Sequence, residues 1–75
     1  MITLNDLLDI ADGDRVTVYA PATEHVNTRI DFTTQDRAVL SDVRTLYGER
    51  EVKQILQMRK GEMLMVQLGE VQRDG

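Results

Sequence analysis

Residues 49–68 read EREVKQILQMRKGEMLMVQL, and the second half of this stretch decides the fold. As an extended chain it has two apolar faces, Leu64, Val66 and Leu68 on one side and Met63 and Met65 on the other. A strand that is apolar on both faces lies either in the centre of a covered sheet or in a subunit interface. We therefore expect this strand to need a neighbour, and we leave open whether that neighbour belongs to the same chain or to a second subunit.

The twelve or so preceding residues fit two structures. Residues 49–60 are good helix formers with apolar residues at helical spacing, but Val52, Gln54, Leu56 and Met58 also alternate as in a strand, with Ile55 on the other face. We favour the strand, because the apolar strand needs a neighbour and Arg59-Lys60-Gly61 suits a hairpin turn. A β-bulge would repair the imperfect alternation.

A second pair of strands comes earlier in the chain. Residues 15–20 alternate between polar and apolar side chains and end at Pro21, which cannot donate a ladder hydrogen bond. The alternation resumes over residues 28–33, after a polar loop. We expect an antiparallel hairpin whose outward residues, 15, 17, 19 and 29, 31, 33, share one side of the sheet.

Two helices complete the pattern. Thr3 and Asp6 form a capping box before an apolar stripe of Leu4, Leu7, Leu8 and Ala11. A second helix is capped by Thr33 or Thr34, carries the apolar stripe Val39, Leu40, Val43, Leu46 and Tyr47, and ends at Gly48. The order helix, hairpin, helix, hairpin predicts one small α+β domain over residues 1–68 with a four-stranded antiparallel sheet, both helices on one face, and a flexible tail over residues 69–75.

Composition narrows the function. The chain has 75 residues and no cysteine, which removes disulfides, thiolate nucleophiles and Cys-ligated metals. There is neither a membrane-spanning run nor a signal peptide, so we expect a cytoplasmic protein without membrane contact. A net charge of −4 argues against a polynucleotide partner. Seven of the nine basic residues are arginine, whose planar fork suits carboxylate or phosphate: Arg15, Arg29, Arg37, Arg44, Arg50, Arg59 and Arg73.

Catalytic and metal-binding patterns are weak. His25 lies in a polar loop beside Glu24, which is typical of a solvated side chain. Asp9, Asp12 and Asp14 lack the spacing of a calcium loop. Phosphate-loop, dinucleotide, zinc-protease and serine-hydrolase motifs are absent. We expect a binding protein and not an enzyme, with no metal and no cofactor.

The most suggestive group is Tyr19 with Arg15 and Arg29. On neighbouring strands these side chains share one face, where a ring stacks on a base and guanidinium groups pair with phosphates. The alternative is a solvated sheet face with Arg–Asp pairs. We assign Tyr47 and Arg50 to the same ligand site.

Self-association is the remaining expectation. Met58, Met63 and Met65 lie close together in the last hairpin, and a small domain without disulfides gains stability by assembling. We expect a homo-oligomer with these methionines in its interface. Subunits that meet in this way would also deepen a shallow ligand site into a pocket.

The opening LNDLLDIADGDRVTVY and the closing YGEREVKQILQMRKGEMLMVQL resemble small accessory proteins encoded by bacteriophages and prophages. The resemblance covers residues 3–20 and 47–68 and implies a phage context in which anti-defence proteins are prominent. In that context, the host bacterial cytosol, we expect an oligomeric sponge that sequesters a small nucleotide-derived immune signal, on the strength of the arginine excess, of Tyr19 beside Arg15 and Arg29, and of the last hairpin. The alternatives are a direct inhibitor of a host defence protein, similar to anti-CRISPR proteins, and a structural or regulatory phage factor.

Overall fold

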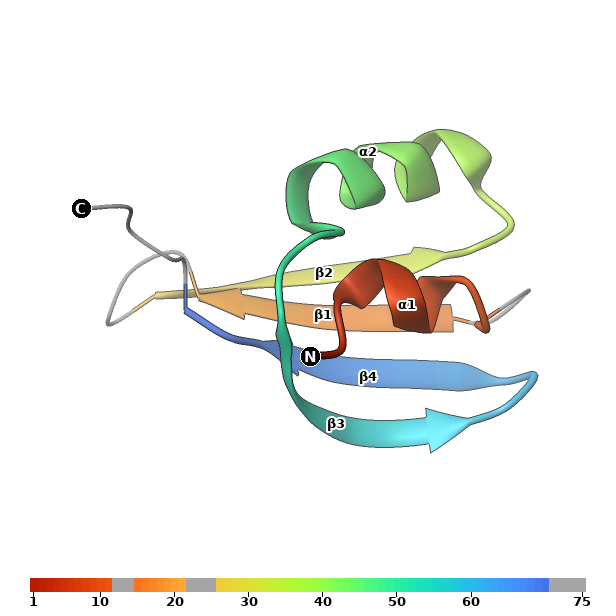
Figure 1. Cartoon of the computed structure of the whole chain (residues 1–75). Coiled ribbons are helices and arrows are strands. Elements are labelled where there is room, and N and C mark those ends of the chain that lie inside the picture. The colour runs from red at the N-terminus through yellow and green to blue at the C-terminus, as the bar shows by residue number, and fades with distance from the viewer. Residues whose placement is uncertain (12–14, 22–25, 71–75) are drawn as a thin grey trace.

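A computed structural model describes residues 1–11, 15–21 and 26–70. The elements follow in the order α1 (Leu4–Leu8), β1 (Arg15–Pro21), β2 (Asn27–Thr33), α2 (Arg37–Tyr47), β3 (Val52–Arg59) and β4 (Met63–Leu68). They form two layers, with all four strands in one sheet and both helices over the same face of it (Figure 1). The predicted α+β class is confirmed.

The strands lie in the order β2-β1-β4-β3. β1 pairs antiparallel with β2 and β3 pairs antiparallel with β4, but β1 and β4 are parallel. The predicted antiparallel sheet is therefore wrong, and the sheet is mixed. The reason is α2, which carries the chain from β2 at one edge back over the covered face to β3 at the other edge. A helical crossover returns the chain to the end it left, so β2 and β3 run in the same direction, and so do their antiparallel partners.

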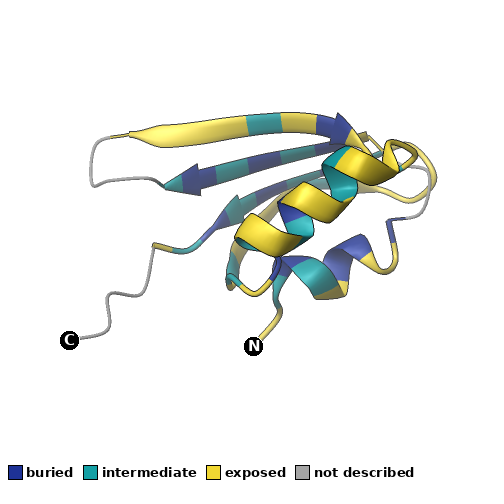
Figure 2. Ribbon diagram, turned by 90° about the horizontal axis from the view of Figure 1, so that it is seen from above, coloured by how far each residue is buried: buried dark blue, intermediate teal, exposed yellow. Residues whose placement is uncertain are grey.

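β4 lies in the centre of the sheet, between β1 and β3. This position accounts for its two apolar faces. Under the helices, the inward residues of β1 and β4 form the core with at most 1% exposure: Val16, Val18, Ala20, Leu64, Val66 and Leu68. Alternating buried and half-exposed bands along these strands contrast with the exposed edge strand β2 (Figure 2).

β3 resolves the ambiguity of residues 49–60 in favour of a strand. The register with β4 shifts twice, leaving Lys53 and Leu56 as extra residues, so the bulge expected there occurs in duplicate. The strand runs on through Arg59, and the turn consists of residues 60–62. Gly61 has φ +83°, the left-handed conformation that a three-residue hairpin turn requires of one residue.

Both helices begin at capped residues. Thr3 and Asp6 form the predicted capping box, with bonds of 2.9 Å from the Thr3 amide to Asp6 Oδ2 and 3.3 Å from the Asp6 amide to Thr3 Oγ1. In α2 the cap is Asp36, which accepts from the Val39 amide, and not Thr33 or Thr34. Thr33 belongs to β2, so the later residue with a short acidic side chain takes the cap.

The N-terminal segment closes part of one sheet edge. The Val52 amide donates to the Ile2 carbonyl over 2.8 Å and the Leu4 amide donates to the Arg50 carbonyl over 3.0 Å, so Thr3 and Glu51 form a bridge. This segment covers the start of β3, which is otherwise an edge strand. An edge partly covered and broken by bulges is a poor template for another strand.

The two helices are joined by Arg44, which donates to Asn5 Oδ1 at 3.0 Å and pairs with Asp9 at 2.8 Å. Gly48 follows α2 directly, and a Cβ there would collide with the Asn5 side chain. The helix layer thus depends on contact between α1 and the C-terminal end of α2. No helix in the described ranges is long and apolar enough to cross a lipid bilayer.

Candidate ligand face of the sheet

The side of the sheet away from both helices, which we call the open face, carries the alternate residues of each strand. The register arranges them in three rows across the sheet. The first row is Thr33–Arg15–Met63–Arg59, the second is Asp31–Thr17–Met65–Gln57, and the third is Arg29–Tyr19–Gln67–Gln54. Each row runs from β2 to β3, and neighbouring positions lie about 5 Å apart.

The second row holds a carboxylate. Asp31 accepts a 2.6 Å hydrogen bond from the Thr17 hydroxyl and a 3.0 Å ion-paired bond from Arg29 Nε. The Thr17 hydrogen bond, together with the Arg29 hydrogen bond and the charges of Arg29 and Arg15, holds the pKa of Asp31 below its ordinary value of 3.8, although desolvation acts in the opposite direction. Asp31 is therefore ionised at neutral pH.

The third row pairs a ring with a cation. Tyr19 and Arg29 are directly opposite on β1 and β2, and the guanidinium carbon of Arg29 lies 5.8 Å from the centroid of the Tyr19 ring. That distance is within the range of a cation–π contact. The contact and the Asp31 ion pair hold the guanidinium beside the ring.

The first row contains two further arginines. The Arg15 guanidinium makes no hydrogen bond or ion pair with any residue that the structure describes. Arg59 has only a long 3.8 Å contact with Glu62, and both side chains are more than 60% exposed. Such an exposed pair contributes little. Both guanidinium groups of this row are therefore available to an anion.

A shallow concavity of about 470 Å³ lies over part of these rows. Its lining includes Arg15, Arg29 and Asp31 together with the half-buried Met63 and Met65. Guanidinium groups beside thioether side chains would suit a ligand that has both an anionic group and an apolar ring.

The charge of this face opposes that of the chain. Its three rows contain three arginines and one carboxylate, whereas the whole sequence has nine basic and thirteen acidic residues. Of the six arginines in the described residues, three lie on this face and three in α2 or the loop after it. The open face is therefore a local positive surface on an acidic protein.

The structure brings together part of the predicted site. Arg15, Tyr19 and Arg29 share the open face with the predicted register. Tyr47 and Arg50 do not join them. They contact each other, with the Arg50 guanidinium carbon 5.8 Å from the Tyr47 ring centroid, at the end of α2 and in the loop after it.

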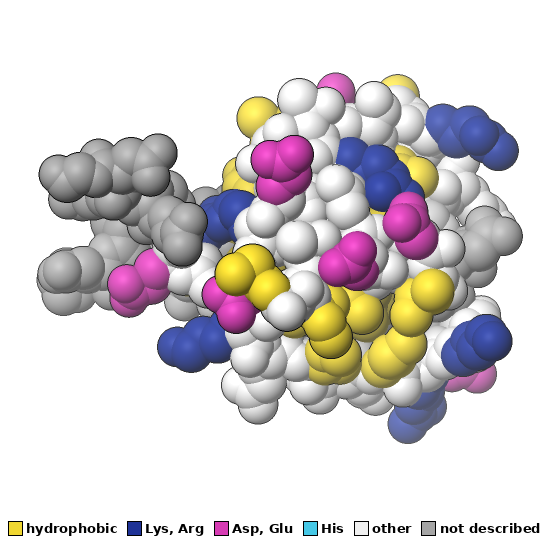
Figure 3. Space-filling model, in the orientation of Figure 1, with side chains coloured by type: hydrophobic (Ala, Val, Ile, Leu, Met, Phe, Trp, Pro, Cys, Tyr) yellow, Lys and Arg dark blue, Asp and Glu magenta, His cyan; other side chains and the backbone are white. Residues whose placement is uncertain are grey.

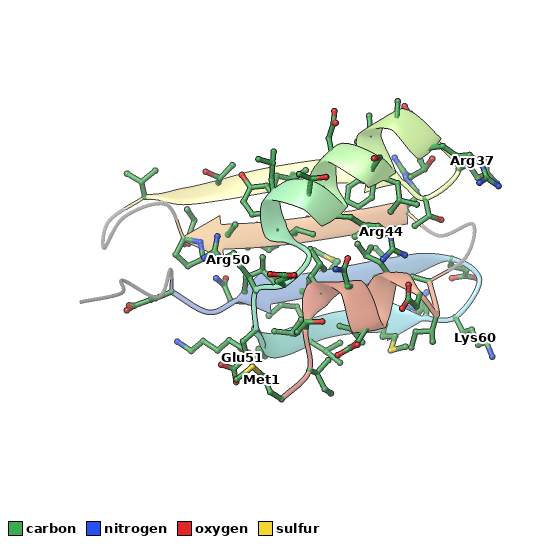
Figure 4. All side chains as sticks on the ribbon, turned by 45° about the horizontal axis from the view of Figure 1, so that its top comes forward. Met1, Arg37, Arg44, Arg50, Glu51 and Lys60 are labelled. Carbon is green, nitrogen blue, oxygen red and sulfur yellow. The ribbon has the colours of Figure 1, made fainter. Side chains whose placement is uncertain are left out.

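Arg50 binds the protein itself. Its guanidinium donates to the carbonyls of Pro21 at 3.2 Å and Gly69 at 2.6 Å, at the carboxyl ends of the parallel strands β1 and β4 (Figure 4). Its Nε is buried without a partner among the described residues. Gly69, assigned from sequence to the tail, is held at both its amide and its carbonyl, and residues 71–75 lie outside the described part.

The predicted interface methionines separate. Met63 and Met65 lie on the open face, while Met58 pairs with Leu64 and so points to the helix side, where it is 46% exposed. They form no single patch, and self-association stays a prediction. Sequence reasoning missed Arg59, which it placed in the turn. Gly61 carried the signal, since a left-handed glycine at that position leaves Arg59 in the strand.

The remaining candidates add no site. His25, Asp12 and Asp14 lie outside the described residues, and Asp9 is paired with Arg44. Across residues 1–11, 15–21 and 26–70, no three histidine or acidic side chains are placed to hold a metal ion. No family model, curated protein or solved structure matches the chain. The phage resemblance stays a prediction.

Proposed function

We propose that the protein binds a small nucleotide-derived anion on the open face of its sheet and acts by sequestration. The observation that carries the proposal is the unpaired Arg15 guanidinium in the same concavity as Arg29, whose guanidinium contacts Tyr19. An arginine fork binds phosphate in two parallel hydrogen bonds, and a tyrosine ring stacks on a base. In a phage-infected cell, such a protein would remove a nucleotide signal used in host defence.

Binding without chemistry suits these groups. Arginine stays protonated at any physiological pH, so it holds an anion but does not exchange protons with it. Asp31 is committed to Thr17 and Arg29 and orients the guanidinium of Arg29. These contacts restrict the Arg29 side chain, which is 61% exposed, and so reduce the entropy lost when a ligand binds.

The test is calorimetric titration of the protein with AMP, ATP, ADP-ribose and a cyclic dinucleotide at low ionic strength. We expect at least one to bind, and Arg15→Ala to weaken it at least tenfold, since a charged hydrogen bond contributes about 1.5–3 kcal/mol. Arg37→Ala is the matched control, because Arg37 is exposed at the start of α2 in the helix layer (Figure 4). It removes the same charge from the other side of the molecule.

Two results would contradict the proposal. One is the absence of binding for the whole panel at millimolar concentration. The other is an equal loss of affinity in Arg15→Ala and Arg37→Ala, which would reduce the effect to net charge. Light scattering with and without nucleotide gives the mass of the complex and tests the predicted homo-oligomer in the same samples.

A protein partner is the second candidate, favoured by apolar side chains gathered near α1 and the β3 side of the sheet (Figure 3). Exposed large apolar residues in these parts of the chain are Ile2, Ile10, Ile55, Leu56 and Met58, each 41–55% exposed. A contiguous patch of this kind on a small domain is typical of protein interfaces. A stable complex with a purified defence effector that is lost in Ile55→Lys but kept in Arg15→Ala would favour direct inhibition over nucleotide binding.

A further inference from the structure

We infer that the ligand is a nucleotide that carries a phosphate well beyond its base, a nucleoside triphosphate, with Arg59 as a second phosphate-binding residue beside Arg15. This inference rests on the proposed function. It adds a residue from a third strand and a length requirement for the ligand.

Arg15 and Arg59 are the two arms of one site in the first row. Met63 lies between them on β4, paired with Arg15 on one side and with Arg59 on the other. Their Cα atoms are two strand spacings apart, about 10 Å, which two arginine side chains bridge from opposite sides of a phosphate. Arg15 is unpaired among the described residues, and Arg59 has only the 3.8 Å contact with Glu62.

Tyr19 and Arg29, which would bind the base in the third row, lie at a fixed distance from Arg15 and Arg59 in the first row. Tyr19 follows Arg15 by four residues on β1, so the first and third rows are about 13 Å apart. Arg29 is fixed beside Tyr19 by its contacts with the ring and with Asp31. A base stacked in the third row therefore needs a long link to bring its phosphate to the first row.

The second row disfavours a shorter ligand. A phosphate joined to the base through one ribose would lie near this row, beside Asp31. The carboxylate already occupies the Thr17 hydroxyl and the Arg29 Nε as donors, and its charge, partly offset by the Arg29 ion pair, opposes a second anion. A terminal phosphate would lie beyond Thr17 and Met65, farther from the carboxylate, and would contact Arg15 and Arg59 in the first row.

The experiment compares ATP with AMP on five proteins by calorimetry: wild type, Arg15→Ala, Arg59→Ala, Lys53→Ala and Arg37→Ala. Lys53 is the matched control on β3, because it is exposed and is an extra residue without a partner in the register. We expect wild type to bind ATP more tightly than AMP. In Arg59→Ala the affinity for ATP should fall about tenfold, and the affinity for AMP by less than about twofold. Both control variants change either affinity by less than about twofold. Amide chemical shifts report the contact directly, with Arg59 and Met63 moving on addition of ATP and not of AMP.

Three results separate the two proposals. Equal affinity of wild type for ATP and AMP, with binding abolished by Arg15→Ala, overturns the length requirement and leaves the proposed function standing. A loss for ATP in Lys53→Ala as large as in Arg59→Ala overturns the role of Arg59, since any nearby positive charge would then serve. Binding of neither nucleotide, nor of ADP-ribose or a cyclic dinucleotide, contradicts the proposed function itself.

Discussion

The two faces of the sheet come from the same strands and have opposite chemistry. Leu64 and Val66 on β4 lie under the helices with at most 1% exposure, whereas their neighbours Met63 and Met65 are half-buried on the open face. Three arginines share that open face with one carboxylate. Side chains alternate between the two faces of the sheet, so one step along a strand moves from the core to the surface. Residues that stabilise the fold and residues that could bind a ligand therefore alternate along the same strands. Substitutions at adjacent positions should therefore have different consequences.

The largest effect is expected for Leu64→Ala. Leu64 is 1% exposed, and a cavity there costs about 2–5 kcal/mol of unfolding free energy, a large share of the stability of so small a domain. Met63→Ala, one residue away, should cost about 1 kcal/mol. Urea unfolding measures both. Equal costs would show that the open face is covered in solution, as in the predicted homo-oligomer.

Arg50→Ala comes next. It leaves the carbonyls of Pro21 and Gly69 without their charged donor, which should cost about 2 kcal/mol. Arg37→Ala, an exposed arginine, should change stability by less than about 0.5 kcal/mol. Thermal unfolding of the two variants checks this. Equal melting temperatures of the two variants would show that Arg50 does not stabilise the fold, and Arg50 would again be a candidate for the ligand site predicted from sequence.

Thr3→Ala tests the cover over the buried face. It removes the Thr3 Oγ1 acceptor of the capping box at the start of α1, which should cost about 1 kcal/mol. The open face does not contact α1, so nucleotide affinity should stay within twofold of wild type. A loss of affinity as large as that of Arg15→Ala would mean that the two faces are coupled.

The smallest effect concerns Asp31. Because its pKa in the folded protein is lowered, its contribution to stability is present above pH 3.8 and disappears as the pH falls through the lowered value. Thr17→Val removes the 2.6 Å hydrogen bond and should raise the pKa of Asp31 toward 3.8, as measured by NMR titration of the carboxyl carbon. An unchanged pKa would assign the shift to Arg29 instead.

Local patterns predicted much of this structure. The capping box at Thr3, the facing residues of β1 and β2, and the strand over residues 52–59 all depend on neighbours in sequence or on one turn. The parallel pairing of β1 with β4 was missed because two hairpins can be joined along either edge. Their order depends on the path of α2 over the sheet, which no local pattern records.

The candidate site was predicted in part for the same reason. Arg15, Tyr19 and Arg29 belong to one strand pair, so alternation was enough to bring them to one face. Arg59 joins them only through β4, across the pairing that the sequence did not reveal. Arg50 was predicted in the site but does not join it. Its partners are the backbone carbonyls of Pro21 and Gly69, and a sequence does not show where carbonyl groups come together.

The central place of β4 also governs when the protein can fold. β1 precedes β4 by more than forty residues, yet each completes the other's hydrogen bonding and core. During synthesis, the first hairpin and α2 leave the ribosome before the strand that they need. The sheet and its core are therefore incomplete until residues 63–68 have been synthesised. Closing a loop of that length before any core contact forms slows folding and leaves apolar strands open to chaperones or proteases in the interval.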